Sequence, residues 1–176
     1  MSIPFFVLLG FPGSGKTTLT KTFIKKHPQF QLIFVFDFFL KNKLVNKKGV
    51  ALDKDYVKKG HRFLYQSFRE ITQPTILELG TSLPSFNAQK IKKLKEKHNI
   101  KLKILFCVCD PEIALQRHLR RHRAVPYKLK YLRIRYQRDY PGEYLRYCKK
   151  YKLPHLMVDT TKPVADNIKI WEGLLK

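Results

Sequence analysis

The sequence contains few cysteines and no long apolar run, and each shortage excludes a class of protein. Its three cysteines, Cys107, Cys109 and Cys148, are too few for a disulfide framework, and none has the C-x-x-C spacing of a metal or redox site. Buried, reduced thiols are therefore expected, as is typical of an intracellular protein. No apolar run is long enough to span a membrane, so we expect a soluble, cytoplasmic protein.

Acidic residues are also scarce. The 176 residues include 36 Lys and Arg against 13 Asp and Glu, which gives a net charge of +23. Such an excess attracts polyanions and is screened by salt. It can equally serve solubility or reflect a lysine-rich proteome, so the charge alone does not identify a partner. The length is typical of one domain with a sizeable core, and we expect a single domain over residues 1–176.

A glycine-rich stretch near the N-terminus, G-F-P-G-S-G-K-T at residues 10–17, fits the phosphate-binding pattern G-x-x-x-x-G-K-[ST] at every fixed position. The apolar run Ile3–Leu9 before it predicts a strand, and Thr17–Lys26 after it predicts a helix. Strand, glycine loop and helix in this order are the context that the motif requires. The main-chain N–H groups of the loop and the helix N-terminus would then form a concave anion site.

Two side chains of this loop have expected roles toward the phosphates of a nucleoside triphosphate. Lys16 would reach the β- and γ-phosphates, and the hydroxyl of Thr17 would ligate Mg²⁺. The residues expected to bind the nucleotide are Gly10, Pro12, Gly13, Ser14, Gly15, Lys16, Thr17 and Thr18. The sequence therefore predicts a nucleoside triphosphate as ligand.

Apolar strand-like runs alternate with helical patterns along the chain, which predicts an α/β fold with a parallel sheet of about five strands and helices on both faces. The strands are expected at Ile3–Leu9, Gln31–Phe36, Thr75–Leu79, Lys103–Cys109 and His155–Val158. The helices are expected at Thr17–Lys26, Asp53–Ile71, Phe86–His98, Pro111–Arg121, Pro126–Tyr140 and Pro163–Leu174. The polar, lysine-rich stretch Lys41–Gly49 is expected to be an exposed loop.

In open parallel sheets the ligand lies beyond the carboxyl ends of the strands, so residues that follow a strand are candidates for the site. Asp37 follows the second strand in a very apolar run, where it could accept the proton of a hydroxyl that attacks the γ-phosphate. A carboxylate that only ends the strand or caps a helix is the alternative. Glu78 follows the third strand and could hold Mg²⁺, directly or through water.

After the fourth strand, Asp110 is expected to cap a helix that carries several arginines. Arg117 and Arg121 are four residues apart and share one face of this helix. They could clamp the transferring phosphoryl group, as a mobile arginine-bearing lid over about residues 117–126, with Arg120 on the nucleotide. After the last strand, residues 159–163 could pass beside the nucleotide base, and Thr160 or Thr161 could cap the final helix.

A basic, tyrosine-rich segment extends from Arg117 to Lys152, with thirteen Lys and Arg and only two acids. Seven of the nine tyrosines lie there, at positions 127, 131, 136, 140, 144, 147 and 151. Tyr136 and Tyr140 fit a helical stripe that faces the core. The remaining tyrosines, with Lys130, Arg133, Arg135 and Arg138, could stack on bases and pair with phosphates, or form only the basic outer face of an amphipathic helix.

With these residues the chain resembles P-loop kinases of the polynucleotide kinase and zeta-toxin-like group, and within it the phage-type 5′-hydroxyl polynucleotide kinase domain. The resemblance rests on the loop at Gly10–Thr18, on Asp37, and on R-x-x-x-R at 117–121 followed by Ala-Val-Pro at 124–126. It implies ATP and Mg²⁺ as cofactors and phosphoryl transfer to the 5′-hydroxyl of DNA or RNA. It also implies central roles for Lys16, Thr17, Asp37 and Arg121, with Arg117 beside them.

Two other functions stay open. A small-molecule kinase of the same fold would act on a nucleoside, nucleotide, sugar or antibiotic, and the charge would then be incidental. A nucleotide-dependent nucleic-acid-binding protein would have no phosphate acceptor. A GTPase switch is its obvious form, but the sequence contains no Asn-Lys-x-Asp stretch to read guanine.

Overall fold

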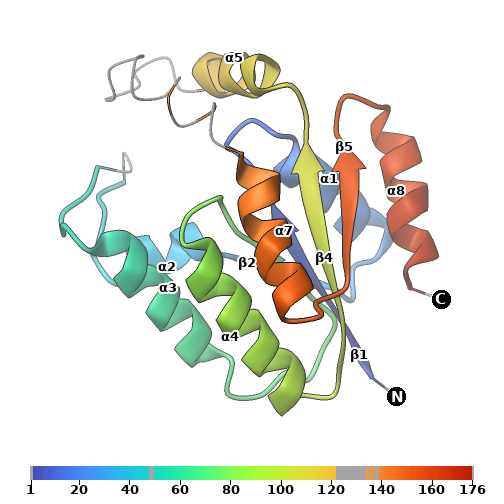
Figure 1. Ribbon diagram of the computed structural model, residues 1–176, viewed down its shortest axis with the longest axis horizontal. Helices are drawn as coiled ribbons and strands as arrows, with labels where there is room; N and C mark the ends of the chain where they lie inside the picture. Colours follow the sequence, from blue (N-terminus) through green and yellow to red (C-terminus); the bar gives the residue numbers. More distant parts are fainter. Residues whose placement is uncertain (1, 48–49, 122–133, 135, 137–138, 176) are drawn as a thin grey trace.

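The computed structural model describes residues 2–47, 50–121, 134, 136 and 139–175, and gives no side-chain account of Arg121. The described strands form a single parallel sheet with the order β2-β3-β1-β4-β5 (Figure 1). Their bounds are β1 Ile3–Leu9, β2 Gln31–Phe34, β3 Thr75–Glu78, β4 Ile100–Val108 and β5 His155–Asp159. The expected parallel α/β sheet is confirmed, and β1 lies at its centre between β3 and β4.

Helices cover both faces of this sheet, which makes three layers (Figure 1). Their bounds are α1 Lys16–Lys26, α2 Val35–Lys41, α3 Tyr56–Ser67, α4 Pro84–Lys97, α5 Pro111–Arg121, α7 Tyr140–Lys150 and α8 Val164–Gly173. Alternate residues of β1 face the two sides, as the pleat of a strand requires. Phe6 and Leu8 pack with residues of α1 and α8, whereas Phe5, Val7 and Leu9 pack with residues of α3, α4 and α7.

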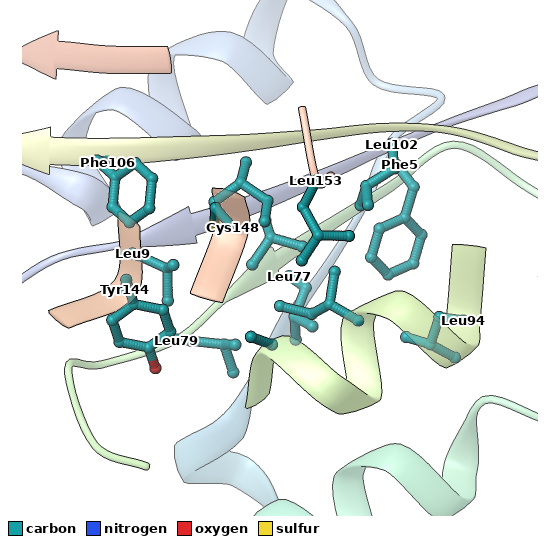
Figure 2. Close-up of a cluster of buried hydrophobic side chains, with 14 of the residues drawn as sticks. Phe5, Leu9, Leu77, Leu79, Leu94, Leu102, Phe106, Tyr144, Cys148 and Leu153 are labelled. Atoms are coloured by element: carbon teal, nitrogen blue, oxygen red, sulfur yellow. The ribbon is translucent and has the colours of Figure 1, made fainter. Parts of the chain in front are cut away.

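The larger of the two apolar layers lies between the sheet and helices α3, α4 and α7. Figure 2 shows Leu9 and Leu77 of the sheet in the same cluster as Leu94 of α4 and Tyr144 and Cys148 of α7. Burial raises the pKa of the Cys148 thiol to about 11 and that of the Cys107 thiol to about 12. Both thiols are therefore neutral at physiological pH, in keeping with the buried cysteines that the sequence predicts.

The second strand is shorter than the sequence predicts. It pairs with β3 over only four positions, and the last pair joins Phe34 to Glu78. Because β3 also ends at Glu78, the apolar residues beyond Phe34 have no strand to pair with. The chain forms helix α2 there instead, which satisfies its backbone hydrogen bonds locally. The expectation of a strand as far as Phe36 was therefore wrong.

Two further segments differ from expectation. Helix α7 was not foreseen; it begins where the Asp139 carboxylate accepts a hydrogen bond of 3.0 Å from the Gly142 N–H. The expected helix Pro126–Tyr140 lies mostly outside the described residues. The stretch 41–49 is not wholly exposed, because Leu44 and Val45 are buried against Phe39 in a small cluster.

Candidate active site

The glycine loop joins β1 to α1 at the carboxyl edge of the sheet (Figure 1). Gly13 and Gly15 both have φ of +82°, a region that residues with a Cβ rarely adopt. Gly13 is also constrained from outside, since a Cβ there would collide with the carbonyl oxygen of Ala114 and lie 3.1 Å from the backbone nitrogen of His118. Helix α5 thus packs directly against the loop, and only glycine fits at this contact.

Lys16, the lysine of the motif, is 8% exposed and folds back over the loop. Its Nζ donates to the carbonyl oxygens of Gly10 and Phe11, both at 2.8 Å. Among the other loop residues, Ser14 is buried and Thr18 lies at a pocket described below. The ammonium is thus held over the loop whose N–H groups would face a phosphate.

The two residues expected to hold Mg²⁺ are in contact. The Thr17 hydroxyl donates to Oε1 of Glu78 at 2.8 Å, although 61 positions separate them. Glu78 is the last residue of β3 and is 7% exposed. A hydroxyl and a carboxylate oxygen are ligands of the kind that Mg²⁺ takes, usually together with waters and substrate phosphates. The residues present therefore fit this ion.

One side of the loop opens into a pocket of about 180 Å³, called here the Arg117 pocket. Its lining residues are Gly13, Gly15, Thr18, Leu19, Arg117, Thr160, Lys162, Val164 and Asn167. Two cations and several polar groups thus line this side of the loop. Thr160 and Lys162 belong to the stretch expected to pass beside the nucleotide base, and that role stays a prediction. The expectation that a threonine caps the final helix was wrong, because α8 has no side-chain cap and begins after Pro163.

The other side of the loop opens into a pocket of about 330 Å³, called here the Phe36 pocket. Its lining residues are Pro12, Gly13, Gly15, Lys16, Thr17, Phe34, Phe36, Glu78 and His118. The Thr17–Glu78 contact lies in this pocket and not in the first. Gly13 and Gly15 line both pockets, so the phosphate loop is the wall between them. Phe34, Phe36 and His118 were not expected at the site from the sequence.

Asp37, the expected general base, is not at a strand end. It lies in the first turn of α2, three residues beyond the end of β2, and its side chain is exposed. Its neighbour Phe36 lines the Phe36 pocket, but Asp37 is not among the lining residues. The expected position at the strand end was wrong because β2 ends early. The role of Asp37 as base stays a prediction.

The arginines of the expected lid are separated by the structure. Asp110 caps α5 as expected, since its Oδ1 accepts from the Glu112 N–H at 2.8 Å. Arg117 is half-buried and lines its pocket, whereas Arg120 is exposed and lines neither pocket. The side chain of Arg121 and the rest of the expected lid, residues 122–126, lie outside the described residues.

Two tyrosines of the basic segment make hydrogen bonds to the backbone in and beside the loop. The Tyr136 hydroxyl donates to the carbonyl oxygen of Pro12 at 2.6 Å, and its ring stacks on Phe11 with centroids 4.9 Å apart. The Tyr140 hydroxyl donates to the carbonyl oxygen of Leu9 at 2.8 Å. These two residues were expected only to fill the core. The large aromatic residue at position 11 inside the loop was the signal that a ring partner was needed.

The expected base-stacking role of the remaining tyrosines fails for Tyr144, which is 1% exposed. Its hydroxyl donates to the carbonyl oxygen of Ser82 at 2.9 Å. Tyr147 and Tyr151 are half-buried and stack on each other. The other residues proposed for nucleic-acid contact lie outside the described residues: Tyr127, Lys130, Tyr131, Arg133, Arg135 and Arg138.

Several solved structures of kinases have a fold similar to this one. A gluconokinase from Sinorhizobium meliloti 1021 superposes with a TM-score of 0.66 at 15% identity, covering 98% of this chain and 91% of that one. A shikimate kinase from Acinetobacter baumannii gives 0.67 at 15%, covering 98% and 93%. A putative kinase from Chloroflexus aurantiacus gives 0.67 at 15%, covering 100% of both chains. At such identities the likeness establishes the fold alone.

No protein-family model and no curated protein sequence matches this chain. Among the described residues, no helix is both long and apolar enough to cross a membrane.

Proposed function

We propose that this protein is an ATP-dependent kinase that transfers the γ-phosphoryl group to a hydroxyl of a small molecule. The observation that carries the proposal is the pair of pockets on opposite sides of one phosphate loop. A kinase must hold two substrates with the transferring group between them, and such positioning supplies much of the catalysis in phosphoryl transfer. The Arg117 pocket would take the nucleoside end of ATP, and the Phe36 pocket the γ-phosphate and the acceptor.

The residues of the loop would act on the phosphates. Lys16 would exchange its bonds to the loop carbonyls for the β- and γ-phosphate oxygens and so stabilise their charge. Thr17 and Glu78 would hold Mg²⁺, which when bound neutralises charge on the phosphates. Arg117 would contact the nucleotide from α5. Arg121 and Arg120 keep their proposed roles on the transferring phosphate and the nucleotide.

The acceptor hydroxyl would need a base. As its oxygen bonds to the γ-phosphorus, the bond to the β-phosphate oxygen breaks and ADP leaves, while the hydroxyl proton passes to a carboxylate. We assign this role to Asp37, which follows the residue that lines the Phe36 pocket. Glu78 is the competing carboxylate, because it lies in the pocket itself.

Two observations favour a small acceptor. The Phe36 pocket, at about 330 Å³, lies near the lower end of the usual range for small-molecule sites, and it must hold the γ-phosphate as well. Two of the structural neighbours are named as a gluconokinase and a shikimate kinase, and both names refer to small hydroxylated acids. A sugar acid, sugar or similar metabolite is therefore the preferred class.

The 5′-hydroxyl of a polynucleotide is the second candidate, as the sequence resemblance implies. The net charge of +23 favours it. None of the three neighbours named above is named for a nucleic-acid substrate, and Tyr144, one of the proposed base-stacking tyrosines, is buried. The small acceptor is therefore placed first.

The test is transfer of labelled γ-phosphate from ATP with Mg²⁺ to a panel of hydroxyl acceptors. The panel contains gluconate, shikimate, common sugars, nucleosides, and 5′-hydroxyl DNA and RNA oligomers, with Lys16→Ala as the control. The expected result is that wild-type protein labels a small acceptor and that Lys16→Ala does not. Label on an oligomer alone would replace the first candidate with the second. Nucleotide binding without transfer to any acceptor, including water, would refute a kinase.

A further inference from the structure

A third hollow lies between helices α3 and α4, away from the phosphate loop. It has a volume of about 340 Å³, and we call it the α3–α4 groove. Its lining residues are Arg62, Tyr65, Gln66, Phe68, Lys90, Lys93, Leu94 and Lys97. Helix α4 ends at Lys97, three positions before β4 begins at Ile100. This end of the groove therefore lies toward the amino edge of the sheet, opposite the edge that carries the loop (Figure 1).

The groove is positively charged on both walls. Arg62 comes from α3, and Lys90, Lys93 and Lys97 come from α4. The three lysines follow an i, i+3, i+7 pattern, which places them in one stripe along the helix. The lining residues include no Asp or Glu.

Acidic groups elsewhere on α4 do not neutralise this stripe. Glu96 forms its salt bridge with Lys92 at 2.9 Å, and neither residue lines the groove. Within the described part of the chain, none of the four groove cations forms a salt bridge with a carboxylate. Their charge is therefore available to an anion from outside.

The floor of the groove is apolar and closed. Tyr65, Phe68 and Leu94 are 8%, 6% and 6% exposed, and the Tyr65 hydroxyl points inward to donate to Oδ1 of Asn87 at 3.1 Å. These rings therefore cannot stack on bases. The Lys90 ammonium lies 5.4 Å from the centroid of the Phe86 ring. This cation–π contact holds Lys90 at the α4 wall of the groove. The groove thus suits a ligand recognised by its negative charge and not by its bases.

We propose that the α3–α4 groove binds the sugar-phosphate backbone of a nucleic-acid strand. A rise of 1.5 Å per residue spaces the three lysines about 4.5 and 6 Å apart along the α4 axis. A row of cations at short intervals matches a chain of phosphates better than it matches one anion. A chain with an isoelectric point near 10.1 and a net charge of +23 has the electrostatic character of a nucleic-acid-binding protein. Phosphate contacts of this kind position a strand without reading its sequence.

This proposal does not depend on the proposed kinase activity, so its test omits ATP. The probes are 5′-phosphorylated, fluorescently labelled single-stranded DNA and RNA oligomers of mixed sequence, and binding is measured by anisotropy from low to moderate salt. The groove variant carries Arg62→Gln, Lys90→Gln, Lys93→Gln and Lys97→Gln. The matched variant loses the same charge at exposed lysines elsewhere, with Lys21→Gln, Lys25→Gln, Lys149→Gln and Lys169→Gln.

For the wild type, affinity should fall steeply with salt, because each neutralised phosphate of a single strand contributes about 0.7 to the slope of log K against log salt. The groove variant should lose at least about tenfold in affinity and about 2 to 3 in slope, if all four cations contact phosphates. The matched variant should lose less than about threefold, since distant charges are screened. Unchanged melting temperatures would show that both variants are folded.

Three results would overturn the proposal. The first is wild-type protein that does not bind either oligomer at low salt. The second is equal loss in the groove and matched variants, which would assign binding to the whole surface charge. The third is that poly-glutamate, an acidic peptide, binds as tightly as the oligomers and that the groove variant loses this binding too. That result would make the groove a site for an acidic protein.

Discussion

The two pockets beside the phosphate loop differ in the chemistry of their walls. Arg117 and Lys162 bring positive charge to one pocket, and Thr18, Thr160 and Asn167 add polar groups. The other pocket is lined by the rings of Phe34 and Phe36 and the carboxylate of Glu78, together with Lys16 and His118. A nucleotide needs cations and hydrogen-bond partners, whereas an acceptor needs a shaped wall and a nearby carboxylate. Under the proposed function, this difference assigns the donor to the Arg117 pocket and the acceptor to the Phe36 pocket.

The largest effects are expected at the two carboxylates on the acceptor side. Asp37→Asn should lower kcat by about 10²-fold or more with ATP affinity largely kept, because an amide cannot accept the hydroxyl proton. Glu78→Gln should lower kcat by a similar factor and raise the Mg²⁺ concentration needed for half-maximal rate, because an amide is a weaker ligand for a hard cation. Steady-state rates at several Mg²⁺ concentrations measure both effects.

Asp55→Asn is the matched control, since Asp55 is also an exposed aspartate beside a helix start. It should leave kcat within about twofold of wild type, as surface changes outside a site usually do. If Asp37→Asn kept near-normal turnover while Glu78→Gln lost turnover at every pH tested, the role of base would move to Glu78.

Effects of intermediate size are expected from one substitution in each pocket, and the two substitutions should raise the KM of different substrates. Arg117→Ala should raise KM for ATP about tenfold, the equivalent of about 1.4 kcal/mol, and leave KM for the acceptor unchanged. Phe36→Ala should do the reverse, because it removes ring area only from the acceptor side. Initial rates with each substrate varied in turn give both constants. If both variants raised the KM of the same substrate, the two pockets would belong to one binding site, which would contradict the assignment.

A smaller effect is expected where a tyrosine supports the wall between the pockets. Tyr136→Phe removes only the hydroxyl that donates to the Pro12 carbonyl oxygen, while the ring can still stack on Phe11. The lost hydrogen bond should cost about 1 kcal/mol, or about fivefold in kcat/KM for ATP. Tyr147→Phe, on a half-buried ring outside both pockets, is the control and should change nothing. Equal losses in the two variants would show that the contact with Pro12 does not matter.

The sequence predicted most of the donor side. The glycine motif has fixed spacing, so the loop and β1 could be located from residue types alone. The roles of Lys16 on the phosphates and of Thr17 on Mg²⁺ stay predictions. Glu78 was found because the carboxyl ends of parallel strands meet at one edge. Helix α5 was predicted with its observed bounds, Pro111–Arg121, because Asp110 and Pro111 mark its start.

The acceptor side was harder to predict because it depends on where strands stop pairing. Residues 34–36 are apolar whether they form a strand or a helix, and only the early end of β3 decides that β2 stops at Phe34. That choice moved Asp37 into a helix and brought Phe36 to a pocket with His118, 82 positions away along the chain. The spacing of apolar residues and tyrosines likewise indicated that some tyrosines are buried. It did not indicate that the Tyr136 hydroxyl bonds to Pro12 in the loop and the Tyr140 hydroxyl to Leu9 at the end of β1.

The most direct test of the two-sided site is amide hydrogen exchange with each substrate added separately. ADP with Mg²⁺, which has no γ-phosphate to enter the Phe36 pocket, should slow exchange in residues 10–20 and 159–164 and leave residues 34–40 unchanged. The acceptor found by the transfer assay, added with ADP, should then slow exchange in residues 34–40. Protection of residues 34–40 by the nucleotide alone, or of residues 159–164 by the acceptor, would contradict the assignment of donor and acceptor to opposite sides of the loop.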